Sequence, residues 1–326
     1  VVTAIAADPA QAKQLTWKGR TVAIVTNGTR VLGLGDVGPE ASLPVMEGKA
    51  LFYAELVGIN AVPLVLDADD PDDVIDTVVR IAPGFGGIHL EDIATPGVYH
   101  IEEELERRLE VPVLHDDQHG TAVVLMAAVL VAARQVGKEL GSLTFGQVGL
   151  GAAGSAVAAL ASGFGFASVV AFDPSPLAVQ RLRRIADLSA RLHAGTADAD
   201  FDTVLDNSDV LVMTTGKAGL LPPERVRDGQ IVMALSNPVP EIGIAEAREA
   251  GAAVAADGSI VNNVLAYPGL FKGALDANAG SITPEMKRAA ALALASCSDG
   301  RILLPDPLDR DVHRRVSEAV AAAAHD

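Results

Sequence analysis

The chain has 326 residues, of which 49% are hydrophobic and 21% are charged, so it can bury the cores of about two domains. Its formal net charge of −17 argues against binding to nucleic acid or to an anionic membrane surface. The single cysteine, Cys297, excludes an internal disulfide framework. No leader pattern stands at Val1, and the longest apolar run, from Ala122 to Ala133, is too short to span a bilayer. We therefore expect a cytoplasmic protein of two domains.

Residues 1–118 alternate short apolar runs with polar segments of helical pattern. This alternation predicts parallel βαβ units, in which helices cover both faces of a sheet. Asn27-Gly28 separates two apolar runs and indicates a hairpin turn. The expected strands are Thr21–Val25, Val31–Leu34, Ala61–Leu66, Phe85–Leu90 and Val111–Leu114, and the expected helices are Pro44–Gly58, Asp70–Arg80 and Tyr99–Leu109.

The βαβ pattern starts again after an apolar helix that we predict for Thr121–Val136. The chain from Leu270 onward is rich in alanine and is expected to be helical. We thus predict an α/β fold with a parallel-sheet catalytic domain over residues 1–118 and a Rossmann-type dinucleotide-binding domain over 119–326, which ends in C-terminal helices. Its expected elements are the strands Leu143–Val148, Ser168–Phe172, Val210–Met213, Ile231–Ala234 and Ala253–Ala255 and the helices Ala152–Gly163 and Pro176–Ala190.

A glycine loop between a predicted strand and a predicted helix indicates dinucleotide binding. Gly149, Gly151 and Gly154 match the pattern G-x-G-x-x-G, with Ala152 and Ala153 between the last two glycines. The first glycine permits a tight turn, the second lets the backbone approach a pyrophosphate, and the third lets helix and strand pack closely. A glycine turn without a ligand is the alternative interpretation.

Asp173 ends the next predicted strand, where a carboxylate is expected to bind the adenosine ribose. It would repel a 2′-phosphate, so NAD is favoured, and NADP stays open because Arg181, Arg183 and Arg184 follow on the next helix. Further cofactor-binding candidates are Thr215 and Gly216.

Two pairs of adjacent carboxylates follow predicted strands of the first domain. Glu91-Asp92 comes after Phe85–Leu90, and Asp116-Asp117 comes after Val111–Leu114. The carboxyl ends of parallel strands lie at one edge of a sheet, where open α/β sheets bind ligands. A set of oxygen ligands without cysteine favours Mg²⁺ or Mn²⁺ over structural zinc. Two solvated helix caps are the simpler alternative.

Lys49 stands in an otherwise apolar stretch of the first domain. A lysine that is partly buried beside a divalent cation loses its proton far below its usual pKa of about 10.4, and it can then act as a general base. A surface lysine with its stem on apolar neighbours is the alternative.

Several blocks of the sequence resemble the signature sequences of malic enzymes, and in particular of the compact prokaryotic members. They occur in the family's order and extend over most of the chain, from about Thr16 to Pro284. The blocks are Val31–Asp36, Pro44–Ala50, Leu90–Ile93, His115–Thr121, Ala234–Pro238 and Val261–Gly269.

The resemblance implies oxidative decarboxylation of L-malate to pyruvate and CO₂, with NAD(P)⁺ and Mg²⁺ or Mn²⁺ as cofactors. Under it, Glu91, Asp92 and Asp117 match the metal ligands of the family. Lys49 matches the general base, and Asp116 matches the carboxylate beside that base.

The resemblance also implies contacts with substrate and cofactor and a state of assembly. Asn237 and Asn263 match positions that contact the substrate and the nicotinamide end of the cofactor. Arg30 stands where the larger members have an arginine that binds a malate carboxylate. Members of the family form homodimers or higher oligomers, and we expect the same here.

One feature of the family does not occur in the sequence. Malic enzymes have an acid tyrosine in a Tyr-Thr-Pro-Gly-Val block ahead of the segment that matches Val2–Asp8. None of the tyrosines of this chain, Tyr53, Tyr99 and Tyr267, occupies that position. We expect the block to belong to a segment ahead of Val1, and the alternative is a protein without this acid.

Three other functions stay open at this stage. A dehydrogenase for a 2-hydroxy acid or an amino acid would use the dinucleotide but no metal, which leaves the carboxylate pairs unexplained. A regulator would bind dinucleotide or malate without turnover. A malolactic enzyme would convert malate to lactate at the same site.

Overall fold

The computed structural model describes residues 1–31, 33–188 and 201–325, which form two compact units. The first unit comprises Val1–Asp117, Val264–Ala290 and Pro307–Asp326, and the second comprises Gln118–Asn263 and Ala291–Asp306. The first boundary lies close to the expected one. The C-terminal helices differ from the expectation, because most of them group with the first unit and not with the nucleotide-binding domain.

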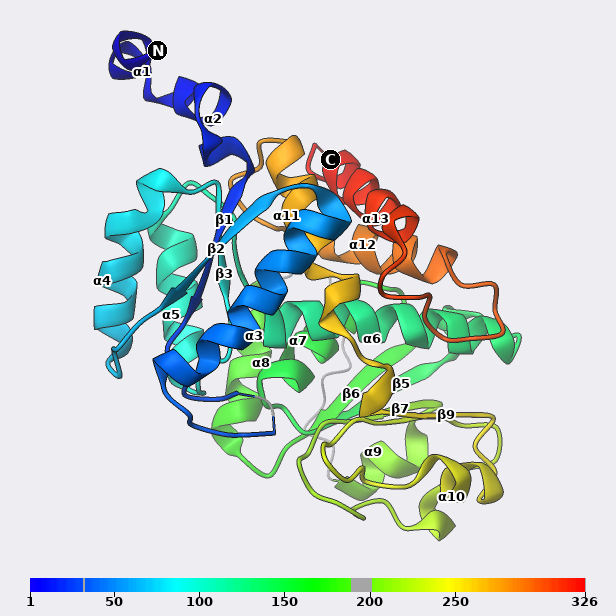
Figure 1. The fold of residues 1–326 in the computed structure, drawn as a ribbon. Helices are drawn as coiled ribbons and strands as arrows, with labels where there is room; N and C mark the ends of the chain where they lie inside the picture. Colours follow the sequence, from blue (N-terminus) through cyan, green and yellow to red (C-terminus); the bar gives the residue numbers. More distant parts are fainter. Residues whose placement is uncertain (32, 189–200, 326) are drawn as a thin grey trace. The chain divides into compact units, whose positions relative to one another are not determined.

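The first unit contains a parallel sheet (Figure 1), in which the strand order is β2-β1-β3-β4. Its strands are β1 (Thr21–Thr26), β2 (Asn60–Val65), β3 (Gly87–Leu90) and β4 (Val113–His115). Its helices are α1 (Val2–Ala7), α2 (Ala12–Leu15), α3 (Pro39–Phe52), α4 (Pro71–Ile81), α5 (Gly97–Arg108), α11 (Tyr267–Asp276) and α13 (Arg310–Ala323). The predicted parallel βαβ arrangement of this region is confirmed.

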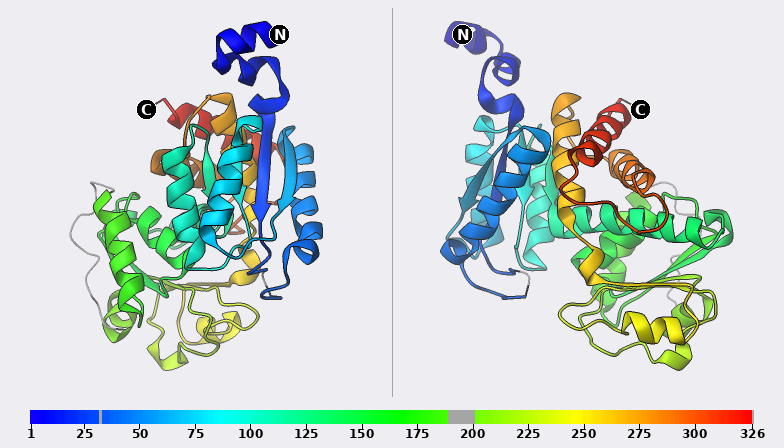
Figure 2. Two further views of the ribbon diagram at one scale, coloured as in Figure 1. Left: turned by 90° about the vertical axis from the view of Figure 1, so that its left-hand side faces the viewer. Right: turned by 45° about the vertical axis from the view of Figure 1, so that its right-hand side comes forward.

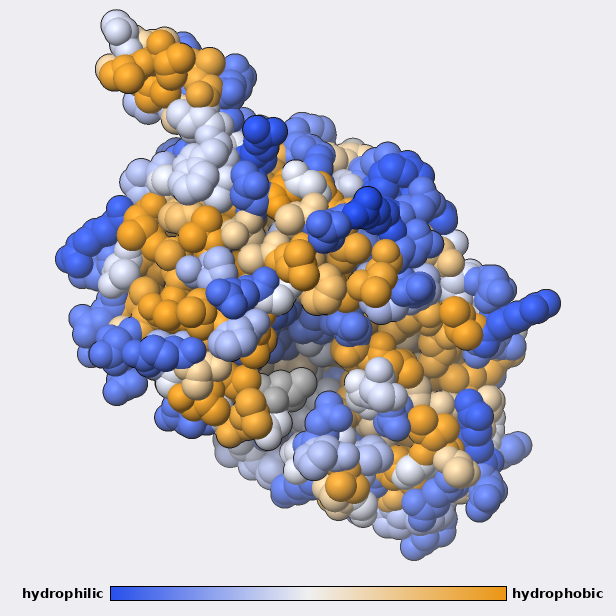
Figure 3. All heavy atoms as spheres, in the orientation of Figure 1, coloured by the Kyte–Doolittle hydropathy of each residue, from blue (hydrophilic) through white to orange (hydrophobic). Residues whose placement is uncertain are grey.

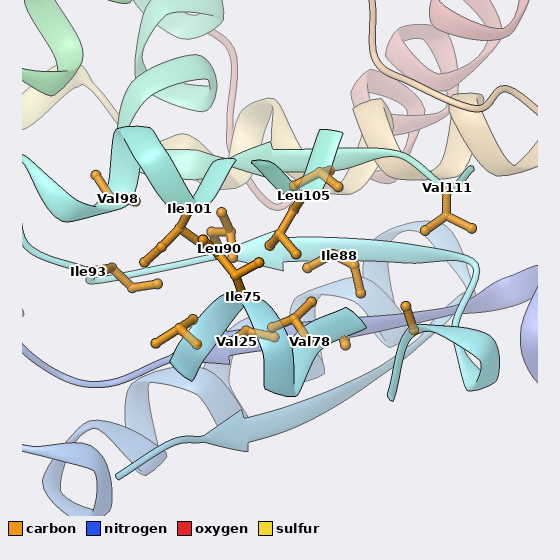
Figure 4. Close-up of a cluster of buried hydrophobic side chains, with 14 residues drawn as sticks. Val25, Ile75, Val78, Ile88, Leu90, Ile93, Val98, Ile101, Leu105 and Val111 are labelled. Atoms are coloured by element: carbon orange, nitrogen blue, oxygen red, sulfur yellow. The ribbon is translucent and has the colours of Figure 1, made fainter. Parts of the chain in front are cut away.

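The two faces of β3 have different neighbours. Ile88 and Leu90 belong to an apolar core that also contains buried residues of α4 and α5 (Figure 4). Because side chains alternate along a strand, His89 points to the other face. There its imidazole stacks on Phe271 of α11, with ring centroids 5.7 Å apart. This contact links α11 to the sheet of the first unit.

Close packing of α11 and α13 explains the place of the C-terminal helix. An added Cβ on Gly273 would lie 2.5 Å from the Ser317 carbonyl oxygen of α13, and one on Gly269 would lie 2.6 Å from Val316. The two glycines therefore let the helix backbones approach each other.

The predicted hairpin at Asn27-Gly28 is wrong. β1 pairs in parallel with β2 and β3, and after β1 the described chain forms a loop in which Val31 makes an isolated bridge to Gly35. Repeated left-handed backbone conformations prevent an extended strand here. They occur at Gly28, Gly33, Gly35 and Gly38, while Leu32 of the expected strand lies outside the described residues.

Two helices begin earlier than the sequence suggests. Helix α3 begins at Pro39, five residues before the expected Pro44, because a proline fits the first turn of a helix. Helix α6 (Asp116–Gln135) begins at Asp116 and not at Thr121. Its first turn therefore contains Asp116 and Asp117, whose negative charge is favourable at a helix N-terminus.

The second unit contains a parallel sheet with strand order β6-β5-β7-β8-β9, which confirms the Rossmann-type fold. Its strands are β5 (Thr144–Val148), β6 (Ser168–Phe172), β7 (Val210–Met213), β8 (Ile231–Ala234) and β9 (Val254–Asp257). Its helices are α6 from Gln118 onward, α7 (Ala152–Ala161), α8 (Pro176–Leu188), α9 (Phe201–Asn207) and α10 (Ile244–Glu249), and α12 (Pro284–Ser296) belongs partly to each unit. The last two residues of the expected helix Pro176–Ala190 lie outside the described residues.

An N-terminal arm, residues 1–20, precedes β1 and projects from the sheet of the first unit (Figures 1 and 2). None of the residues of α1 and α2 is buried. The arm carries apolar surface (Figure 3), to which Val1, Val2, Leu15 and Trp17 contribute.

No helix among the described residues combines the length and the apolar character that crossing a membrane requires.

Candidate active site

Three carboxylates converge in the first unit, where β3 and β4 end. Glu91 and Asp92 follow β3, and Asp117 stands in the first turn of α6, directly after β4. One oxygen of each carboxylate lies within 4.8 Å of the others. Glu91 and Asp92 are buried, and Asp117 is half-buried. The structure thus brings together the two carboxylate pairs that the sequence places at neighbouring strand ends.

Asp92 has a backbone conformation that is unusual for a residue with a side chain. Its φ of 51° is left-handed, which costs about 1–2 kcal/mol in an L-residue. The Asp92 N–H donates to Oδ2 of Asp117 at 3.3 Å, and the Asp92 carbonyl accepts from the N–H of Arg30 at 3.0 Å. These bonds hold the strained turn and bring the Arg30 backbone beside the carboxylates. The Arg30 side chain donates to Oγ1 of Thr95.

Lys49 of α3 connects the two carboxylate pairs. Its Nζ lies 2.9 Å from Oε1 of Glu91 and 2.9 Å from Oδ2 of Asp116. The ammonium also lies 4.6 Å from the ring centroid of Tyr267, at the start of α11, in a cation–π contact. Only 14% of the Lys49 side chain is exposed, so the interpretation of a surface lysine is wrong.

The expected low pKa of Lys49 presupposes a divalent cation beside it and stays a prediction, because the protein groups alone have the opposite effect. Burial lowers the pKa of the amine, but the charges of Asp116 and Glu91 outweigh burial and raise the pKa well above its usual value. Burial raises the pKa of Glu91, and although Lys49 opposes that shift, Asp117 and Asp116 add to it. The carboxylates at this site contribute more negative charge than the ammonium of Lys49 can neutralise. This excess of negative charge favours the binding of a divalent cation.

A buried histidine contacts the carboxylate of Asp117. Nε2 of the buried His115 lies 3.1 Å from Oδ2 of Asp117. Burial lowers the pKa of His115, but the hydrogen bond to Asp117 overcomes this and raises it. Burial raises the pKa of Asp117, and the His115 contact reverses that shift and lowers it. His115 thus contacts Asp117, which is one of the three converging carboxylates.

Two buried residues of this site, His89 and Tyr53, are not among the site residues that the sequence predicts. Nδ1 of His89 lies 2.8 Å from the hydroxyl of Tyr53, and its Nε2 lies 2.7 Å from Oε2 of Glu91. Burial lowers the pKa of His89 to about 3, so the imidazole is neutral. The signal in the sequence is the spacing of His89 and Glu91, two residues apart along a strand and its end. Tyr53 has no comparable signal.

The glycine loop of the second unit has the geometry that its pattern predicts. Gly149 has a φ of 89°, and an added Cβ on Gly154 would lie 1.9 Å from the Gly149 carbonyl oxygen. An added Cβ on Gly151 would meet nothing within 4 Å among the described atoms. The backbone at Gly151, directly before Ala152 and Ala153 at the N-terminus of α7, is therefore open to the approach of a pyrophosphate.

Asp173 lies beside this loop after β6. Its Oδ2 accepts from the N–H of Leu150 at 2.7 Å, and its Oδ1 accepts from the N–H of Ser175 at 2.7 Å. Each carboxylate oxygen retains a lone pair for another donor, such as a ribose hydroxyl. Arg181 does reach the loop, where it donates to the Leu150 carbonyl and to Oγ of Ser155.

A buried carboxylate that the sequence analysis missed organises the ends of β7 and β8. Oε1 of Glu241 accepts from the N–H and Oγ1 of Thr215, at 2.8 and 2.7 Å, and from Oγ of Ser236. Oγ of Ser236 in turn accepts from the N–H of Gly216 at 2.7 Å. Thr215, Gly216 and the turn before Asn237 are thereby held together.

Asn263 is the last residue of the stretch Gln118–Asn263 of the second unit. Its Oδ1 accepts from Oγ1 of Thr121 at 3.0 Å.

Comparisons with known proteins agree with both halves of this description. Residues 7–71 match the family model "Malic enzyme, N-terminal domain". Residues 124–218 match "D-isomer specific 2-hydroxyacid dehydrogenase, NAD binding domain", which covers the nucleotide-binding part only. The chain is 45% identical to "NAD-dependent malic enzyme 1" of Bacillus subtilis, over 97% of this chain and 70% of the relative. The chain belongs to the malic enzyme family.

Solved structures of malic enzymes share the fold of the whole chain. The malic enzyme from Pyrococcus horikoshii is 38% identical with a TM-score of 0.87, and the match covers 99% of this chain and 80% of that one. The NAD-dependent malic enzyme from Thermotoga maritima is 35% identical with a TM-score of 0.86, over 98% and 89% of the two chains. A "Bifunctional malic/malolactic enzyme" of Bacillus subtilis is 41% identical over 95% of this chain and 80% of the relative.

Two glycines of the nucleotide loop of this malic enzyme are expected to respond differently to alanine. Gly154→Ala should lower the free energy of unfolding by about 1–3 kcal/mol, because the new methyl overlaps the Gly149 carbonyl. Gly151→Ala should leave stability within about 0.5 kcal/mol, because its Cβ meets nothing and its φ of −65° suits alanine. It should nevertheless weaken NAD⁺ binding, since the methyl enters the space for the pyrophosphate. Urea denaturation and calorimetric titration with NAD⁺ measure the two effects, and unchanged NAD⁺ affinity in Gly151→Ala would contradict the assigned role.

Proposed function

We propose that this chain catalyses the metal-dependent oxidative decarboxylation of L-malate to pyruvate and CO₂, with reduction of NAD(P)⁺. The observation that carries the proposal is the buried Lys49, held between Asp116 and Glu91 next to converging carboxylates. Malic enzymes that resemble the chain over nearly its whole length support it.

Glu91, Asp92 and Asp117 fit a hard divalent cation, because they offer three carboxylate oxygens within 4.8 Å of one another and an excess of negative charge. Bound Mg²⁺ or Mn²⁺ would polarise the oxygens of malate and, through its charge, lower the pKa of Lys49, while bound NAD(P)⁺ would accept a hydride.

Lys49 is the proposed base for the C2 hydroxyl of malate. In the oxidation step C2 loses a hydride, and the hydroxyl proton passes to Nζ of Lys49. Asp116 accepts a hydrogen bond from Nζ at 2.9 Å, so the pair can share the arriving proton. The C3–C4 bond then breaks, CO₂ leaves, and C3 of the pyruvate enolate takes up a proton.

The positions proposed to bind malate are Arg30, Lys49, Asn237 and Asn263. Arg30 is supported by its backbone contact with Asp92. The roles of Asn237 and Asn263 stay predictions that rest on the family motifs.

Replacing Lys49 tests the proposed base. Lys49→Ala should slow NADH-dependent reduction of oxaloacetate by about 10²–10⁴-fold, because that step needs the proton that Lys49 transfers. Mn²⁺ binding should persist, since the ammonium offers no ligand atom to a cation. Lys272→Ala is the matched control, because Lys272 pairs with Asp276 on α11 of the same unit. Loss of NADH absorbance and titration with Mn²⁺ measure the two properties.

Wild-type oxaloacetate reduction in Lys49→Ala would show that the base is misassigned. Full activity after exhaustive chelation would refute the metal-dependent mechanism. Product analysis from L-malate separates the remaining alternatives: lactate would indicate the malolactic reaction, for which the 41% identical bifunctional relative is the precedent. Tight binding of malate or NAD⁺ without any product would indicate a regulator.

NAD⁺ is the proposed preferred cofactor, because Asp173 presents a carboxylate where a 2′-phosphate would lie. Asp173→Ser should lower the ratio of kcat/KM for NAD⁺ to that for NADP⁺ by roughly tenfold or more, the effect of losing one charge-assisted hydrogen bond. Asp206→Ser, at an exposed aspartate of α9, is the control. Steady-state kinetics with both cofactors give the ratio, and a wild-type enzyme that prefers NADP⁺ would point to Arg181 as the dominant neighbour.

The proposed location is the cytoplasm and the proposed assembly is a homodimer or higher oligomer. The acidic composition and the single cysteine support the location. The exposed apolar side chains of the N-terminal arm support the assembly. Sedimentation at micromolar concentration should give at least twice the chain mass of 33.5 kDa, and a monomer would contradict this.

A further inference from the structure

A chain of three buried side chains reaches the carboxylate cluster from the interior of the first unit. The hydroxyl of Tyr53 lies 2.8 Å from Nδ1 of His89, and Nε2 of His89 lies 2.7 Å from Oε2 of Glu91. Tyr53 and His89 are fully buried, and Glu91 is 4% exposed. The roles proposed above use neither Tyr53 nor His89.

When Glu91 binds a cation, it is fixed which groups donate and which accept in the hydrogen bonds that link Tyr53, His89 and Glu91. A ligand carboxylate has to be ionised, so both of its oxygens accept. Oε1 of Glu91 faces the ammonium of Lys49, and Oε2 then accepts from Nε2–H of a neutral His89. Nδ1 is left as an acceptor, and it receives the hydroxyl proton of Tyr53. The imidazole is therefore the Nε2–H tautomer.

Aromatic packing holds the imidazole in the orientation that this direction requires. Its ring is stacked on Phe271, with an interplanar angle of 14°, and meets Tyr267 edge-on with centroids 5.2 Å apart. Phe271 can approach because position 87 is a glycine: an added Cβ on Gly87 would lie 2.9 Å from the Phe271 ring. The ring of Tyr53 packs against the same two aromatic residues.

We propose that Tyr53 and His89 are positioning residues that fix the Glu91 carboxylate so that one oxygen faces Lys49 while the group also binds a divalent cation. The proposal rests on the proposed function, because it takes Glu91 to be a metal ligand. Partners behind a metal ligand affect metal binding without touching the metal, since they hold the ligand in its bound orientation.

Two Tyr→Phe variants form a matched test. Tyr53→Phe deletes the hydroxyl that bonds to His89. Tyr267→Phe deletes a buried hydroxyl that makes no hydrogen bond to any described residue, and it keeps the ring. Tyr53→Phe should weaken Mn²⁺ binding by roughly tenfold, the lower end of the effect usual for such supporting residues. Tyr267→Phe should leave the Kd for Mn²⁺ within about twofold of the wild type, because no partner is lost. Paramagnetic resonance of unbound Mn²⁺ gives each Kd.

Replacement of His89 gives a second comparison. His89→Gln keeps an N–H donor for Oε2 of Glu91, whereas His89→Leu has none. Among variants that fold, His89→Gln should therefore bind Mn²⁺ more tightly than His89→Leu. Equal affinities would contradict a role that depends on the donated hydrogen bond.

The tautomer of His89 supplies a readout that a purely structural role does not predict. In the Mg²⁺-saturated wild-type protein, long-range ¹H–¹⁵N correlation should report the Nε2–H tautomer of His89. An Nδ1–H tautomer would overturn the proposal. The proposal would also be overturned if Tyr53→Phe lowered the melting temperature but left the Kd for Mn²⁺ at its wild-type value. A wild-type protein that binds no Mn²⁺ would instead refute the metal site of the proposed function.

Discussion

The shared ion pair of Lys49 with Asp116 and Glu91 is the interaction on which the first unit depends. It joins α3, the N-terminus of α6 and the end of β3, and the ring of Tyr267 adds α11. A buried charge that loses its partner is strongly destabilising, so each of these elements is held in place by the need to keep the charges paired. The charges of Asp116 and Glu91 also raise the pKa of Lys49, so its amine is a stronger base than burial alone would make it.

The two units bury carboxylates in different ways. In the first unit Glu91 lies among other charged groups, and its protonation depends on them. In the second unit Glu241 has no exposed surface, and the hydrogen bonds that it accepts come from backbone N–H groups and hydroxyls of two strand ends. The first arrangement can respond to an arriving proton or cation. The second fixes the shape of two loops.

Patterns of local chemistry made most of the fold predictable. Parallel strands followed apolar runs, and the carboxylates at Glu91 and Asp117 followed strands, so their convergence could be inferred before any contact was known. The hairpin at Asn27-Gly28 was wrong because a turn sequence shows where a chain bends and not which strand it joins. The effect of the protein groups on the pKa of Lys49 could not be predicted, because it depends on the distances to Asp116 and Glu91, which only the folded chain defines.

Residues that act through a partner were the hardest to predict. His89 and Tyr53 lie far apart in the sequence, and their link exists only because β3 and the π-helical segment Tyr53–Val57 that follows α3 meet in the fold. Phe271 and Tyr267 come from a segment that the sequence pattern assigned to the other domain.

The first unit consists of three separate stretches of the chain, so it cannot be completed early in synthesis on the ribosome. Residues 1–117 supply the sheet, the carboxylates and Lys49, but the rings that cover His89 belong to residues 264–290. Because a nascent chain emerges from its N-terminus, the polar face of β3 stays uncovered by these rings while Gln118–Asn263 of the second unit is translated. The second unit, by contrast, has all the strands of its sheet before residue 264. A chain arrested there would have an intact glycine loop beside an unfinished catalytic unit.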